Sequence, residues 1–102
     1  MTWTKAHDAA RASGGTLASS TSRERNAWLS QTFAKEAAGG LFLGGQCWMP
    51  GGVWEWDAGD KWSFQAWSGE APIYGALILQ QDGTWKAGTF EEERLFLIEL
   101  PQ

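Results

Sequence analysis

The side chains of this sequence that could take part in catalysis are its histidine, its cysteine and a pair of carboxylates. The residues next to each of them argue against a catalytic role. His7 is the single histidine and stands next to Asp8 on the expected exposed side of a helix, without partners for a triad or a metal site. Cys47, in "GGQCWMPGG", has no neighbouring base to activate it, so a packing thiol is the favoured interpretation. Glu55 and Asp57 share one strand face, whereas glycosidase carboxylates flank a cleft from different elements. We therefore expect solvated carboxylates, with Asp57 helping a turn, no catalytic residue and no enzyme activity.

A long region rich in glycine and tryptophan, residues 46–76, carries the side chains that could bind a ligand. Trp48, Met49, Ile73 and Tyr74 lie in or beside it and have no obvious place in a core. Apolar groups clustered on a loop surface are typical of a binding patch, and Trp and Tyr give a large contact area and can stack on a sugar ring. The alternative is that these side chains pack beneath the loop as a second, small core.

Length, charge and composition limit the classes of function. We expect residues 1–102 to form one domain. The net charge is −4 and the basic residues are scattered, which makes nucleic acid a poor partner. Membrane insertion is also not expected, because no apolar stretch approaches the roughly 20 residues that a membrane span needs. Eight tryptophans could supply most of the core, and the single cysteine excludes an internal disulfide.

The hydrophobic periodicity predicts two helices followed by short strands, which is an α+β arrangement. The first helix should begin with Thr2 as N-cap and end at Gly14. A capping box of Thr21 and Glu24 should open the second helix, which we expect to reach Ala37. The expected strands cover residues 41–45, 53–57, 75–81, 84–88 and 94–100.

The order of the motifs resembles that of the C-type lectin-like domain over nearly the whole chain. "TWTKAHDAARASGGTLASSTSRERNAWL" is similar to the family's two-helix opening, and "LFLGG" stands where the family has Trp-Ile-Gly-Leu. "VWEWDAGDKWSFQAW" resembles the entry to the family's long loop, while "DGTWKAG" and "FLIEL" stand where it has Asp-Gly-x-Trp-Asn-Asp and Phe-Ile-Cys-Glu. The resemblance implies two helices, a small antiparallel sheet and a long loop region, with core positions for Trp3, Trp56, Trp67 and Trp85.

The sequence departs from the family at its calcium ligands. In sugar-binding members, calcium is held by a Glu-Pro-Asn or Gln-Pro-Asp loop and by the Asn-Asp pair after the strand Trp. Pro72 matches the family proline, but the four matching ligand positions lack a usable side-chain oxygen: Ala71, Ile73, Lys86 and Ala87. Calcium takes about six to eight oxygens, and the ammonium of Lys86 would repel it. Glu70 is one residue out of register, so we expect no metal site.

The family's usual disulfide bridges and first strand are also missing from the sequence. The positions that match the bridges hold Ala10 and Ile98 for one, and Ala76 with Thr89 or Phe90 for the other. Family domains usually begin with a strand that pairs with the last one, whereas this sequence starts at the first helix. We therefore expect residues 94–100 to form an unpaired apolar edge, either covered by upstream sequence or open to self-association.

Together these features predict a non-catalytic binding module of C-type lectin-like type that needs no calcium and no cofactor. We expect the ligand on the long-loop face, at Gln46, Trp48, Glu70, Ile73, Tyr74 and Lys86. A protein surface and a glycan bound without metal both remain open as ligands. The alternative function is a structural or oligomerisation domain of a larger protein, with no ligand of its own.

Overall fold

The computed structural model describes residues 1–101 and confirms the α+β class. None of the helices in this part of the chain has both the length and the apolar character that a membrane span requires. The elements are, in chain order, α1 (Trp3–Ala12), β1 (Thr16–Leu17), α2 (Arg23–Thr32), a 3₁₀ turn (Ala34–Glu36), β2 (Leu41–Cys47), β3 (Glu55–Trp56), β4 (Gly75–Leu79), β5 (Trp85–Gly88), β6 (Leu95–Phe96) and β7 (Ile98–Glu99).

Helix α1 forms as its sequence predicts. The hydroxyl of Thr2 caps it by accepting a hydrogen bond from the backbone N–H of Lys5 at 3.3 Å. Its buried residues recur at helical spacing and are Trp3, Ala6 and Ala10. Gly14 ends it with a φ of 83°, a conformation that glycine adopts without the steric cost of a side chain.

Helix α2 begins one residue later than predicted and ends earlier. Its N-cap is Ser22, whose hydroxyl accepts from the backbone N–H of Arg25 at 3.1 Å, so the predicted capping box of Thr21 and Glu24 is wrong. Thr21 and Ser22 have the same capping chemistry, and only tertiary packing can choose between two such neighbours. The α-helix stops at Thr32, and the 3₁₀ turn takes the chain onward.

Hydrogen bonds of Asn26 link α2 to the turn between β4 and β5. Its Oδ1 accepts hydrogen bonds from the hydroxyl of Ser20 and from the indole N–H of Trp85, both at 2.8 Å. Its amide donates to the backbone oxygen of Gly83 at 2.7 Å. Because this buried side chain is fully engaged, it holds the helix at a fixed place on the sheet.

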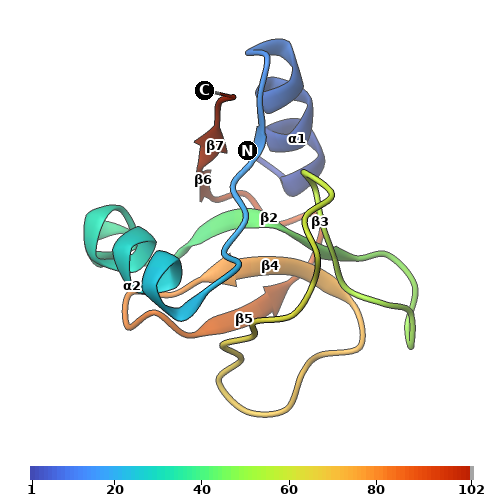
Figure 1. Ribbon diagram of the computed structural model, residues 1–102. Helices are drawn as coiled ribbons and strands as arrows, with labels where there is room; N and C mark the ends of the chain where they lie inside the picture. The colour runs from blue at the N-terminus through green and yellow to red at the C-terminus, as the bar shows by residue number, and fades with distance from the viewer. Residues whose placement is uncertain (102) are drawn as a thin grey trace.

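Strands β3, β2, β4 and β5 lie side by side in that order as an antiparallel sheet, and Figure 1 shows β2, β4 and β5 as neighbouring arrows. Strand β6 joins β2 in parallel, and β1 pairs with β7 in a separate antiparallel pair. Side chains alternate across β4, so Leu77 and Leu79 face one side of the sheet while Ala76 and Ile78 face the other.

The sheet separates two apolar clusters. On the side of α2 and the long loop, the buried residues include Leu29, Leu43, Leu77, Leu79, Trp54, Trp56 and Trp85, with Trp62 and Trp67 packed against them. On the side of α1, they include Trp3, Ala10, Phe42, Ala76, Ile78 and Phe90, with Ile98 packed against them. The first helix therefore lies against the final strand, and Trp3, Trp56 and Trp85 occupy the core positions that the resemblance implied.

The C-terminal segment is paired on one side, so the prediction of an unpaired edge is wrong there. The backbone N–H of Leu97 donates to Phe42 at 3.2 Å, and its carbonyl accepts from Ala18 at 3.0 Å. The partner that the sequence did not reveal is β1, because a two-residue strand has too little pattern to predict. Strand alternation directs the backbone groups of Phe96 and Ile98 to the outer side, where residues 1–101 supply no paired strand.

Candidate functional site

Two loops form the candidate site: residues 48–54, which join β2 to β3, and residues 71–74, which lead into β4. The buried thiol of Cys47 holds them together, because its Sγ lies 3.4 Å from the backbone oxygens of both Met49 and Ile73. The N–H of Gly51 also donates to Ile73 O at 3.1 Å, and the indole N–H of Trp54 donates to Pro72 O at 2.7 Å. Cys47 is thus a packing residue, as expected from the sequence.

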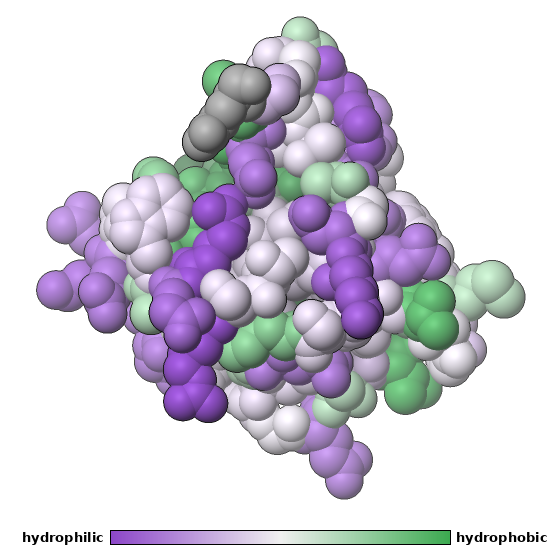
Figure 2. Space-filling view, viewed as in Figure 1, coloured by the Kyte–Doolittle hydropathy of each residue, from purple (hydrophilic) through white to green (hydrophobic). Residues whose placement is uncertain are grey.

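Large apolar side chains stand exposed on these two loops. Trp48 is 50% exposed, Met49 71%, Val53 73%, Ile73 67% and Tyr74 41%; together they are called the loop patch. Figure 2 shows hydrophobic residues gathered on the right of the molecule, over the β2–β3 loop of Figure 1. This exposure argues against the alternative that the side chains form a second core beneath the loop.

Phe90 supports the aromatic half of the loop patch from below. The rings of Trp48 and Phe90 are stacked, with centroids 3.6 Å apart and 7° between their planes. Tyr74 and Trp3 each meet Phe90 edge to face, at 5.6 Å and 5.9 Å. Because Phe90 is itself buried, Trp48 and Tyr74 are held in place before any ligand arrives.

A hollow of about 350 Å³ opens beside Trp48. It is lined by Gln46, Trp48, Met49, Gly52, Val53 and Glu55 and is called the Trp48 hollow. Gln46 and Glu55 face each other across β2 and β3, and the amide oxygen of Gln46 accepts a hydrogen bond from the indole N–H of Trp48. The hollow therefore has apolar walls and one polar end.

The predicted site residues do not all meet. Gln46, Trp48, Ile73 and Tyr74 share the loop surface, whereas Lys86 lies on β5 opposite Ile78 and lines a different hollow with Gln80, Gln81 and Asp82. Glu70 is exposed, and within residues 1–101 no hydrogen bond or ion pair joins it to the loop patch. Val53 and Glu55 were missed as site residues because the "VWEWD" pattern assigned them to a strand.

The positions that match the calcium ligands do not fit a metal. Ala71, Ile73 and Ala87 offer no side-chain oxygen, and Lys86 presents an exposed ammonium. Within residues 1–101, no group of three or more His, Cys, Asp or Glu side chains is placed to hold a metal ion. A site built on these residues would lack the oxygen ligands that calcium requires.

Asp57 is buried and structural, so the expectation of a solvated carboxylate is wrong. Its side chain is 2% exposed and lies 2.6 Å from Nδ1 of His7 and 3.4 Å from the guanidinium of Arg11. It also accepts the backbone N–H of Leu17 at 2.9 Å. His7, which stacks on Trp3, is therefore engaged rather than solvated. These partners are 40 to 50 residues away in the chain, and no local pattern reveals them.

Several solved structures have a fold similar to that of this chain. A calcium-independent type II antifreeze protein superposes with a TM-score of 0.83 at 23% identity, over 96% of this chain and 77% of that chain. Human lithostathine gives 0.84 at 18% identity, over 99% and 85%. The cow C-type carbohydrate-recognition domain of CD23, solved in the presence of a GlcNAc2Man3 oligosaccharide, gives 0.78 at 18%, over 100% and 82%. No protein-family model and no curated protein matches the sequence.

Proposed function

Because the chain has the C-type lectin-like fold, we propose that it is a non-catalytic binding module that takes a protein ligand on the loop patch without calcium. The observation that carries the proposal is the exposure of Trp48, Met49, Val53, Ile73 and Tyr74 on two loops tied together through Cys47. Contiguous exposed apolar side chains are typical of protein-interaction surfaces, and rigid aromatic anchors are typical of their centres.

A protein ligand fits this surface better than a glycan. A sugar-binding site needs an aromatic platform flanked by several polar groups that can hydrogen-bond the hydroxyls. One face of Trp48 is covered by Phe90, and the hollow beside Trp48 offers polar side chains at one end only, from Gln46 and Glu55. The remaining surface consists mainly of aliphatic and thioether groups, which match the apolar centre of a protein interface.

Selection from a displayed random-peptide library, with a parallel glycan array, tests this proposal. Both should be run on the intact chain in excess EDTA. We expect peptides that bind the chain and a Trp28→Ser variant, but not a variant with Met49→Asp and Ile73→Asp. Trp28 is a matched control because it is 53% exposed on α2, away from the loop patch. Peptides that bind the double variant equally well, or glycan binding with no selected peptide, would refute a protein ligand on this face.

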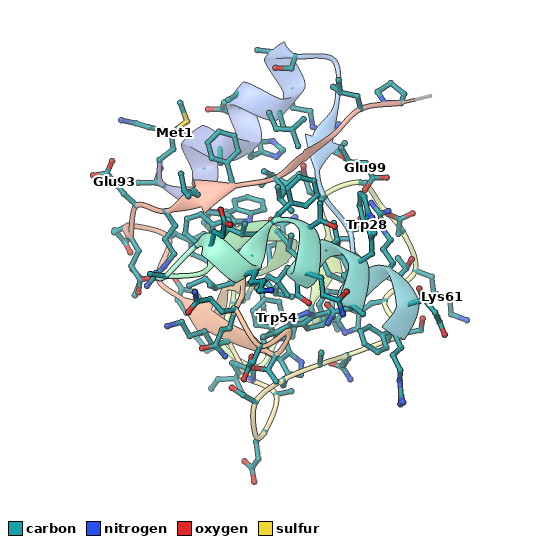
Figure 3. All side chains as sticks on the ribbon, turned by 90° about the vertical axis from the view of Figure 1, so that its left-hand side faces the viewer. Met1, Trp28, Trp54, Lys61, Glu93 and Glu99 are labelled. Atoms are coloured by element: carbon teal, nitrogen blue, oxygen red, sulfur yellow. The ribbon has the colours of Figure 1, made fainter. Side chains whose placement is uncertain are left out.

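Self-association is a second candidate function, and the outer edge of β6 and β7 favours it. Beside this edge, a groove of about 410 Å³ runs between α2 and the C-terminal segment. Its lining includes exposed apolar side chains, and Figure 3 shows Trp28 of α2 beside Glu99. An antiparallel pairing with a second copy, centred on Leu97, would set Phe96 opposite Ile98 and Leu95 opposite Glu99. This register brings no like charges together, so the edge is complementary to itself.

Sedimentation velocity over a wide concentration range tests the second candidate. We expect a dimer that disappears when Leu95 and Leu100, which are 68% and 58% exposed, are both replaced by Lys. Val53→Lys, on the loop patch, should leave the dimer intact. A wild-type chain that stays monomeric at every concentration, or a dimer lost only in Val53→Lys, would exclude this edge as the interface.

A further inference from the structure

The Trp48 hollow has a chemical character of its own within the loop patch. Trp48, Met49 and Val53 form its apolar walls, and Glu55 and Gln46 stand together at its polar end. Its lining contains no Lys, Arg or His side chain. A ligand group that fills it should therefore be apolar along its length and positive or hydrogen-bond donating at its tip.

The carboxylate of Glu55 is free to meet such a group. Glu55 is exposed on β3, and within residues 1–101 it takes part in no ion pair. The neighbouring Gln46 oxygen accepts one hydrogen bond from Trp48 and retains a second lone pair. The polar end thus offers a full negative charge and an acceptor, while an anionic ligand would be repelled.

We propose that the Trp48 hollow binds a lysine or arginine side chain of the protein ligand. This inference rests on the proposed function, because it names the chemistry of the partner that the loop patch takes. The aliphatic stem would lie against Met49 and Val53, as long cationic side chains cover apolar surface while keeping their charge near water. The cationic tip would reach Glu55 and lie near the exposed face of the Trp48 ring, where cation–π attraction adds to the ion pair.

The ¹H–¹⁵N resonance of the Trp48 indole reports directly on this hollow. We would titrate the chain with Nα-acetyl-lysine methylamide and with the neutral analogue Nα-acetyl-norleucine methylamide. Exposed ion pairs contribute about 0.2–1 kcal/mol, so the lysine compound should bind about 1.5- to 5-fold more tightly. Glu55→Gln should remove this advantage without changing the binding of the norleucine compound. Glu70 is an exposed carboxylate outside the hollow, so Glu70→Gln should leave the tighter binding of the lysine compound unchanged.

The outcomes separate this inference from the function on which it rests. Equal affinity for the two compounds, or an advantage that survives Glu55→Gln, overturns the basic ligand, while peptide binding at the loop patch would still stand. A Trp48 resonance that neither compound moves also overturns it. If the lysine compound binds as expected but library selection yields no peptide, the protein-ligand function fails and the hollow's preference for a cation remains. Peptides selected on the wild-type chain should carry Lys or Arg, and those selected on Glu55→Gln should not.

Discussion

The indole ring of Trp48 lies flat against the buried ring of Phe90, with centroids 3.6 Å apart. One face of the indole is thereby fixed to the core cluster on the side of α1, and the side chain remains 50% exposed. A surface aromatic that is already ordered loses little conformational entropy when a ligand covers it. The stack therefore links the packing of the fold to the binding surface.

Replacing Phe90 by Leu should lower the affinity for a ligand at the loop patch while the chain still folds. Without the stack, ordering the Trp48 side chain on binding would cost about 0.5–1.5 kcal/mol, equivalent to about two- to tenfold in affinity. Titration calorimetry with a selected peptide measures this loss. Phe33→Leu, which removes an exposed ring packed edge to face on Trp28, is the matched control and should leave the affinity unchanged. Equal losses in both variants would mean that the stack does not prepare the site.

Asp57→Ala should destabilise the chain by about 1–3 kcal/mol, because it leaves the buried backbone N–H of Leu17 without its acceptor. Urea denaturation measures the free energy of unfolding. Glu55→Ala is the matched control: its carboxylate is exposed two residues away and should change that free energy by at most about 0.5 kcal/mol. Similar values for the two variants would contradict a structural role for Asp57.

Calcium and EDTA should leave the thermal midpoint unchanged, because a cation that does not bind the folded state cannot stabilise it. The matching ligand positions carry Ala71, Ile73, Lys86 and Ala87, which offer calcium no side-chain oxygen. Differential scanning calorimetry in each condition provides the measurement. A midpoint that falls by several degrees in EDTA and recovers with calcium would overturn the prediction that the chain holds no calcium.

Ionisation of Asp82, in the turn between β4 and β5, should make a pH-dependent contribution to the stability of the fold. The hydroxyl of Thr84, and next its backbone N–H, donate to the carboxylate of Asp82 and lower the pKa of Asp82 below its ordinary value. A lowered pKa in the folded state stabilises the fold above the unfolded pKa, and this contribution disappears as the pH falls through the folded pKa. Thr84→Val should raise the pKa of Asp82 in a carboxyl ¹³C titration, whereas Thr89→Val should not. An unchanged pKa in Thr84→Val would contradict the hydroxyl as the cause.

Local patterns were sufficient to predict the two helices and the main strands, but not the bounds of α2, and they left open whether the aromatic side chains of the loop are exposed or buried. The helical spacing of Trp3, Ala6 and Ala10 and the alternation in "VWEWD" reflect burial on one face, whereas the continuous apolar run "GALIL" reflects a strand buried on both faces, and short sequence windows record both kinds of pattern. The order of motifs was sufficient to suggest the C-type lectin-like fold, which the solved structures bear out.

Features that depend on distant partners were not predictable from such windows. The burial of Asp57 depends on His7 and Leu17, which reach it from α1 and β1. Lys86 was grouped with the site because the family places a ligand at that position, but its pairing with Ile78 sets it in another hollow. Val53 follows Gly51 and Gly52, and this glycine pair was the one local signal that it belongs to the loop.

The central claim is that ligand binds the loop patch without calcium, and indole NMR tests it most directly. Trp48 and Trp28 are similarly exposed, at 50% and 53%. The indole N–H resonance of Trp48 reports on the loop patch, and that of Trp28 reports on the surface of α2. On titration of a selected peptide in excess EDTA, we expect the Trp48 resonance to move and the Trp28 resonance to stay. Movement of Trp28 with a stationary Trp48, or binding that appears only after calcium is added, would contradict the account.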